Sequence, residues 1–137
     1  MNQLPEHLES IRQQLNFPLY QVGIAVRAEF CCEYCGKYLL ESIEAYDSWQ
    51  IDHIVPNRDN SPENLALTCK ICNFAKRHSG RKELEQCKTR SERIKCAQQI
   101  ISERISRKKI NLAKVKEFAA LLMKEKIEHD TASHRSL

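Results

Sequence analysis

The chain has 137 residues and a mass of 16.0 kDa, with 42% hydrophobic residues, 29% charged residues and only three glycines. This length predicts one small domain with helical additions, and no apolar run approaches the roughly 18 residues of a membrane-spanning helix. The first ten residues are acidic and contain Pro5, unlike a secretory signal with its basic start and apolar run. We therefore expect a cytoplasmic protein with no membrane partner.

The formal net charge of +4 is distributed unevenly along the chain. Residues 1–67 contain 4 basic and 10 acidic side chains, whereas residues 68–116 contain 15 basic and 4 acidic ones. Residues 117–137 contain 3 basic and 4 acidic side chains. The basic block favours a polyanionic partner such as a nucleic-acid backbone. A solvated helix face rich in lysine and arginine is the alternative that charge alone leaves open.

Two short helices are expected near the N-terminus. Apolar residues recur at helical spacing in residues 5–15 and again in residues 18–30. Residues 32–36 have the composition of a knuckle turn, and residues 37–47 are expected to form a loop and a short strand.

A β-hairpin followed by a helix is predicted next. Residues 49–55 (WQIDHIV) and 64–68 (NLALT) are β-prone, and a polar turn over residues 56–62 joins them. A helix is expected over residues 70–78, with Gly80 ending it.

The remainder of the chain is predicted to be helical. Within residues 81–128, isoleucines at helical spacing indicate one helix, and Asn111 can cap a second one. Joined by residues 107–111 (RKKIN), the two would form a basic αα-hairpin that packs on the core or, in a homodimer, on a second copy of the chain. Residues 129–137 are expected to be disordered.

Four cysteines have the spacing of a zinc site. Cys32 and Cys35 form one C-x-x-C pair, and Cys69 and Cys72 form a second pair, with 33 residues between the two pairs. Two intervening residues let both sulfurs of a knuckle face one ion, so two knuckles complete a tetrahedral Cys₄ site. Gly36 directly follows the first pair and suits a tight turn. We therefore predict one structural Zn²⁺ per chain.

The other cysteines are interpreted as buried or spare thiols. Seven cysteines in a chain without an export signal argue against a disulfide framework. Cys31 competes with Cys32 for the first pair, but only Cys32 has the two-residue spacing to Cys35. Cys87 and Cys96 lie on predicted helices. A redox role for either C-x-x-C pair is disfavoured because neither has a thioredoxin-like βαβ context.

The adjacent Asp52 and His53 are not explained by zinc, because four cysteines already fill its coordination sphere. Successive strand side chains point to opposite faces, so one of the two should face inward. An ionised carboxylate removed from water is costly unless it is paired or binds a metal. The rest of the chain must therefore explain the Asp52 and His53 pair, either by a group that pairs with the carboxylate or by a metal ion that it binds.

The combined pattern is C-x-x-C, then DHIVP, then ENLALTC-x-x-CN-x-x-K, within residues 30–79. In this order the pattern resembles the His-Asn-His (HNH) endonuclease family, in its four-cysteine, zinc-stabilised branch. The matching residues are Cys32, Cys35, Asp52, His53, Pro56, Asn64, Leu65, Cys69, Cys72, Asn73 and Lys76. The resemblance implies an α+β fold with a small ββα-metal core. This core would occupy residues 30–80, preceded by a helical segment at residues 1–29 and followed by the C-terminal helices.

The resemblance also implies the roles of four residues in hydrolysing DNA to products with 5′-phosphate and 3′-hydroxyl ends. His53 would be the general base that deprotonates the attacking water, a role that suits histidine, with its typical pKa of about 6.5. Asp52 and Asn73 would bind one catalytic Mg²⁺ or Mn²⁺, which prefers oxygen ligands. Asn64 would hold the hairpin loop and the histidine in position. DNA is favoured over RNA through the resemblance alone.

Some assignments remain open at this point. Because Asp52 and His53 point to opposite faces of an ideal strand, a local twist or bulge would have to bring both to the scissile phosphate. His78 is an alternative to Asn73 as a metal ligand, although it lies six residues beyond Cys72. Beyond these, Lys76, Arg77 and Arg81 are candidate phosphate contacts, and a merely solvated basic face is the alternative.

Two other functions compete with the nuclease interpretation. A zinc-stabilised module that binds nucleic acid without cleaving it would not need the aspartate, histidine and asparagine set. A protein-interaction module would leave the basic block unexplained as well.

Residues 57–62 also replace the glycine-rich turn of many relatives, which affects the shape of the loop and substrate preference.

Overall fold

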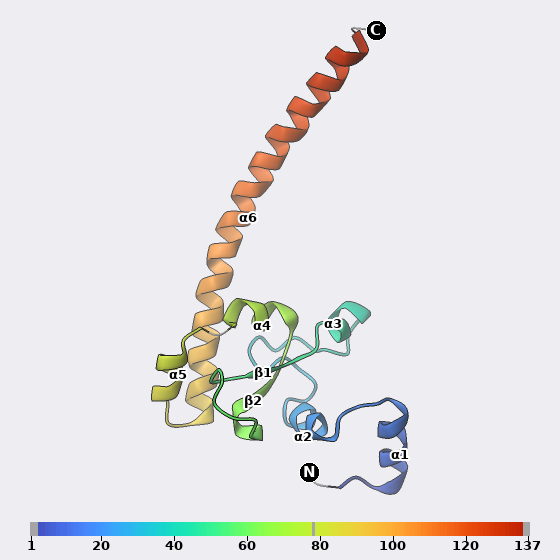
Figure 1. Ribbon diagram of the computed structural model, residues 1–137, viewed down its shortest axis with the longest axis vertical. Coiled ribbons are helices and arrows are strands. Elements are labelled where there is room, and N and C mark those ends of the chain that lie inside the picture. Colours follow the sequence, from blue (N-terminus) through green and yellow to red (C-terminus); the bar gives the residue numbers. More distant parts are fainter. Residues whose placement is uncertain (1–2, 78, 136–137) are drawn as a thin grey trace. The chain divides into compact units, whose positions relative to one another are not determined.

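The computed structural model describes residues 3–77 and 79–135, with side chains up to Glu128 (Figure 1). Its elements in chain order are α1 (Glu6–Gln14), α2 (Leu19–Arg27), α3 (Ile43–Asp47), β1 (Gln50–His53), the 3₁₀ turn η1 (Pro62–Asn64), β2 (Leu65–Thr68), α4 (Lys70–Lys76), α5 (Arg81–Gln86) and α6 (Arg90–Arg135). The chain divides into two compact units, one ending at Ile101 and the other beginning at Ser102.

The first unit contains the predicted ββα core. Strands β1 and β2 pair antiparallel, with Gln50 opposite Thr68 and His53 opposite Leu65. Every residue of β2 is buried, and α2 packs on this strand. Helix α4 packs on β1. Helix α4 begins directly after Cys69. The α+β fold with a ββα-metal core is therefore confirmed.

Local sequence signals explain where the first three helices begin. Proline precedes the first residue of α1 and of α2, where its fixed φ suits a helix start. The Ser42 hydroxyl caps α3 by accepting a hydrogen bond from the Ala45 amide at 3.0 Å. Helix α3 and an isolated bridge between Cys31 and Tyr38 replace the loop and short strand expected over residues 37–47.

The C-terminal region differs from the expected helical hairpin. Helix α6 is continuous from Arg90 to Arg135 and passes through residues 107–111 without a break. The sequence contains no glycine or proline after Gly80, so nothing in it ends a helix, and Asn111 lies inside α6 rather than at a cap. The disorder expected over residues 129–137 stays a prediction: α6 continues to Arg135, and residues 136–137 lie outside the described residues.

Helix α6 exposes large apolar side chains in the second unit. They are Ile110, Leu112, Val115, Phe118, Leu121, Leu122, Met123 and Ile127. Lysines and glutamates lie between some of them, whereas Leu121, Leu122 and Met123 are consecutive. Among the described residues, no helix is both long enough and apolar enough to span a bilayer.

Candidate functional site

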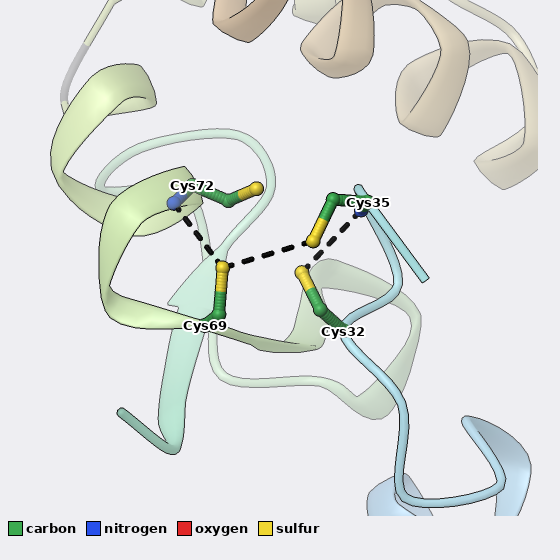
Figure 2. A group of neighbouring side chains, drawn as sticks. All are labelled: Cys32, Cys35, Cys69 and Cys72. Carbon is green, nitrogen blue, oxygen red and sulfur yellow. Dashed lines mark hydrogen bonds between the residues drawn. The ribbon is translucent and has the colours of Figure 1, made fainter. Parts of the chain in front are cut away.

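The four predicted zinc ligands come together at the start of α4. The Sγ atoms of Cys32, Cys35, Cys69 and Cys72 all lie within 4.8 Å of one another (Figure 2). The sulfurs of Cys35 and Cys69 are 3.8 Å apart. A tetrahedral zinc ion with bonds of about 2.3 Å holds its sulfurs about 3.8 Å apart. The cluster therefore fits a zinc ion in ligand type and in spacing.

The ionisation of the cluster also favours a cation. Hydrogen bonds from neighbouring thiols, first from Cys32, lower the pKa of Cys69, whereas burial raises the pKa of Cys35 to about 11. Contacts with the other thiols raise the pKa of Cys72. The lowered pKa of Cys69 favours its thiolate, while the raised pKa values of Cys35 and Cys72 disfavour further negative charge. A divalent cation supplies the positive charge that allows all four to become thiolates.

The two residues between Cys32 and Cys35 attach this knuckle to both strands. The Glu33 carboxylate accepts a hydrogen bond from the Leu67 amide of β2 at 2.8 Å and pairs with Arg27 and Arg90. The Tyr34 hydroxyl donates to Oδ2 of Asp52 in β1 at 2.6 Å. The zinc cluster is therefore coupled to the strand that holds the candidate catalytic residues.

Asp52 and His53 lie on opposite faces of β1. The pairing with β2 is uninterrupted from Gln50 to His53, so no bulge brings the two side chains together. Asp52 is only 7% exposed. Its Oδ2 accepts a hydrogen bond from the Tyr34 hydroxyl and forms an ion pair with Lys76, whose Nζ is 3.0 Å away. The charged partner that a buried aspartate requires is therefore a lysine.

Lys76 is fully buried at the end of α4. Its Nζ lies 3.0 Å from the Asp52 carboxylate and also donates to the main-chain carbonyl of His53 at 3.0 Å. A lysine is stable in the interior only with such partners. The expectation that Lys76 contacts phosphate is wrong for this arrangement, because the packing of α4 on β1 places its ammonium inside the protein.

Asn73 faces the same side of β1 as Asp52. Its Nδ2 donates to Oε1 of Gln50 at 2.8 Å, and Gln50 shares a strand face with Asp52, two residues along. A carboxylate and an amide carbonyl are donors that a hard divalent cation accepts. These residues fit such an ion in chemical type and in strand face, although the ion would have to approach Asp52 beside the Lys76 ammonium.

His53 is held by the loop that joins the two strands. Its Nε2 lies 2.6 Å from Oδ1 of Asn60. Because a carbonyl oxygen can only accept, this contact fits the tautomer that has its proton on Nε2 and its lone pair on Nδ1. Asn64 is 3% exposed and closes the loop by bonding both the amide and the carbonyl of Val55 and the carbonyl of Asp59. Asn60 and Tyr34 were not anticipated: Tyr34 and Asp52 are 18 residues apart, and the contact of Asn60 with His53 depends on how the loop between the strands closes.

The exposed face of His53 opens on a cavity of about 550 Å³. The cavity is lined by Tyr20, Ile24, Ile51, His53, Asn60, Pro62 and Leu65. Most of its wall is therefore apolar, with the imidazole and one amide as polar groups.

The remaining basic candidates are exposed. The Arg77 guanidinium lies 5.7 Å from the centre of the Phe74 ring, and Arg81 pairs with Glu85 on α5. Their proposed contacts with phosphate stay a prediction. His78 lies outside the described residues, so its candidacy as a ligand also stays a prediction.

Comparison with known proteins agrees with this geometry. Residues 32–79 match the family model described as HNH endonuclease, and this segment contains both cysteine pairs, the hairpin and α4. No curated protein and no solved structure matches the chain. The resemblance seen in the sequence is confirmed: the chain contains an HNH endonuclease domain at residues 32–79, with a cysteine cluster compatible with the zinc-binding branch of that family.

Proposed function

We propose that the protein is a metal-dependent HNH endonuclease that hydrolyses phosphodiester bonds in DNA. The observation that supports this most strongly is His53, whose ring is oriented by Asn60 at the wall of a cavity within the segment that matches the family model. Buried asparagine and lysine contacts hold the same strand and loop in place.

His53 is the general base in this proposal. With Nε2 donating to Asn60, the lone pair of Nδ1 takes a proton from the attacking water. The resulting hydroxide attacks phosphorus, the bond to the 3′ oxygen breaks, and this oxygen takes up a proton from solvent water. The products have 5′-phosphate and 3′-hydroxyl ends.

Asp52 and Asn73 would hold the catalytic Mg²⁺ or Mn²⁺ on the α4-facing side of β1, opposite the His53 side chain, so the mechanism requires β1 to twist until the ion and His53 reach one phosphate. When bound, such an ion stabilises negative charge on the phosphorane and on the leaving oxygen. Lys76 keeps the Asp52 carboxylate and the main chain of His53 in fixed relative positions.

The test is cleavage of end-labelled and supercoiled DNA by zinc-loaded protein with Mg²⁺, with Mn²⁺ or with neither ion added. We expect cleavage only with the divalent ion, and product ends that ligase can rejoin, because ligase requires a 5′-phosphate and a 3′-hydroxyl. Products with 3′-phosphate ends, or equal cleavage without Mg²⁺ and Mn²⁺, would contradict the mechanism.

A zinc-stabilised module that binds nucleic acid without cleaving it is the second candidate. The observation that favours it is the engagement of Asp52 by Tyr34 and Lys76, which uses a carboxylate that the nuclease would offer to metal. Intact plasmid together with salt-sensitive DNA binding by folded, zinc-loaded protein would support this candidate over the nuclease.

We also propose that the exposed apolar residues of α6 between Ile110 and Ile127 form a homodimer, offering two sites to the two strands of DNA. Light scattering on the full chain tests this, and a monomer at all concentrations would contradict it. Cysteine pairs used for zinc rather than disulfides suit a reducing compartment, which supports a cytoplasmic location.

A further inference from the structure

The cavity beside His53 is built partly by a helix outside the family domain. Tyr20 and Ile24 of α2 form one wall, and they precede the segment at residues 32–79 that matches the family model. Ile51 and Leu65 of the two strands form the wall next to the imidazole. Its volume of about 550 Å³ lies within the usual range for small-molecule sites. The chain therefore adds an apolar chamber to its HNH core at the position of the proposed base.

Tyr20 gives this chamber an accessible aromatic ring. The residue is 59% exposed, although it lines the cavity. Its hydroxyl accepts a hydrogen bond from Nε2 of Gln21 at 3.1 Å, so the polar end of the side chain has a partner within α2. An exposed aromatic ring beside a nucleic-acid site is a platform on which a base can stack, independent of base identity.

We propose that this cavity accepts the nucleoside next to the scissile phosphate, with its base unpaired and stacked on Tyr20. The inference rests on the proposed nuclease function. A phosphodiester attacked at His53 has a nucleoside on each side, and the apolar wall that contains this histidine is the surface next to one of them. In a continuous duplex both faces of each base are covered by its neighbours and only the edges reach the grooves. Stacking on Tyr20 therefore requires a single strand, a flap or a bulge.

Binding by zinc-loaded protein in buffer without Mg²⁺ or Mn²⁺ separates this proposal from cleavage. Fluorescence anisotropy would compare a labelled single-stranded oligonucleotide with the blunt duplex of the same sequence. The proteins are the wild type, Tyr20→Ala, Tyr20→Phe and Tyr46→Ala. Tyr46 is a matched control, because it is 58% exposed on α3 and does not line the cavity.

We expect the wild type to prefer the single strand. Tyr20→Ala should weaken single-strand binding about 5- to 100-fold, the range for loss of one base stacked on an aromatic ring. Tyr20→Phe keeps the ring and should bind like the wild type, as should Tyr46→Ala. In cleavage assays with Mg²⁺, Tyr20→Ala should lower kcat/KM for single strands and flaps more than for duplex.

Equal single-strand binding by Tyr20→Ala and Tyr46→Ala would overturn the proposal, as would a wild type that prefers continuous duplex. A dimer that Tyr20→Ala dissociates, with no change in DNA binding, would also overturn it by assigning the cavity to a second copy of the chain. If the wild type cleaves nothing but shows the Tyr20-dependent preference, the nuclease function fails while the stacking site stands.

Discussion

At the scale of single residues, the buried ammonium of Lys76 organises the candidate site. It contacts the Asp52 carboxylate and the main-chain carbonyl of the next residue, His53. The two side chains point to opposite faces of β1, so neither can hold the other in place. A cation that contacts both residues keeps the strand in one register against α4. Lys76 is thus a positioning residue whose substitution should affect stability and cleavage together.

Lys76→Met should destabilise the zinc-loaded protein by about 3–5 kcal/mol, because it leaves a buried carboxylate without its charged partner. Urea unfolding monitored by circular dichroism measures this. Lys70→Met on the same helix is the control, since Lys70 is exposed and should tolerate the change.

Adding Asp52→Asn to Lys76→Met removes the unpaired charge, so the double variant should regain part of the lost stability. If the double variant is less stable than Lys76→Met by the full cost of Asp52→Asn alone, the two residues are not coupled and the account of Lys76 is wrong.

At the scale of elements, the turn between α4 and α5 depends on Gly80. Its φ is +70°, and a Cβ atom there would lie 2.2 Å from Cδ1 of Ile100 on α6. Gly23, inside α2, is the opposite case, because a Cβ atom would meet nothing within 4 Å. The two glycines therefore predict opposite effects of the same substitution.

Gly80→Ala should lower the free energy of unfolding by about 1–3 kcal/mol, through backbone strain and the clash with α6. Gly23→Ala should raise it by about 0.5–1 kcal/mol, the gain for alanine in a helix interior. Thermal unfolding of the two variants beside the wild type measures both. A stabilised Gly80→Ala variant would show that Gly80 does not lie against Ile100 of α6.

The zinc affinity of the four-cysteine cluster should change with pH in one direction. In the absence of the ion, the pKa of Cys35 is raised to about 11 and that of Cys72 is also raised, so both thiols hold their protons near neutral pH. Zinc binding requires thiolates and must displace these protons, so zinc affinity should rise as pH rises and fall as pH falls.

Competition with a chromophoric chelator between pH 6 and pH 8 measures this affinity, and calorimetry in two buffers counts the released protons. Cys31→Ser, which alters a thiol outside the cluster, is the control and should leave both results unchanged. Affinity that does not change with pH would contradict a site made of four thiolates.

At the scale of the whole molecule, the sequence predicted the core better than its surroundings. The cysteine spacing and the DHIVP and NLALT runs indicated the zinc cluster, the hairpin and α4, because each depends on local geometry. The burial of Lys76 was not predictable in this way, since its partner Asp52 is on another element. The continuity of α6 was missed because residues 107–111 read as a polar linker, although they contain no residue that ends a helix.

The central claim is that His53 is the base of a nuclease, and nicking of supercoiled plasmid in Mg²⁺ tests it most directly. Zinc-loaded wild type, His53→Ala and the control His7→Ala, an exposed histidine of α1, should be compared at equal folded concentration. We expect His53→Ala to lose about 10²- to 10⁴-fold in rate, the usual contribution of a general base, while His7→Ala nicks like the wild type. Undiminished nicking by His53→Ala would contradict the account.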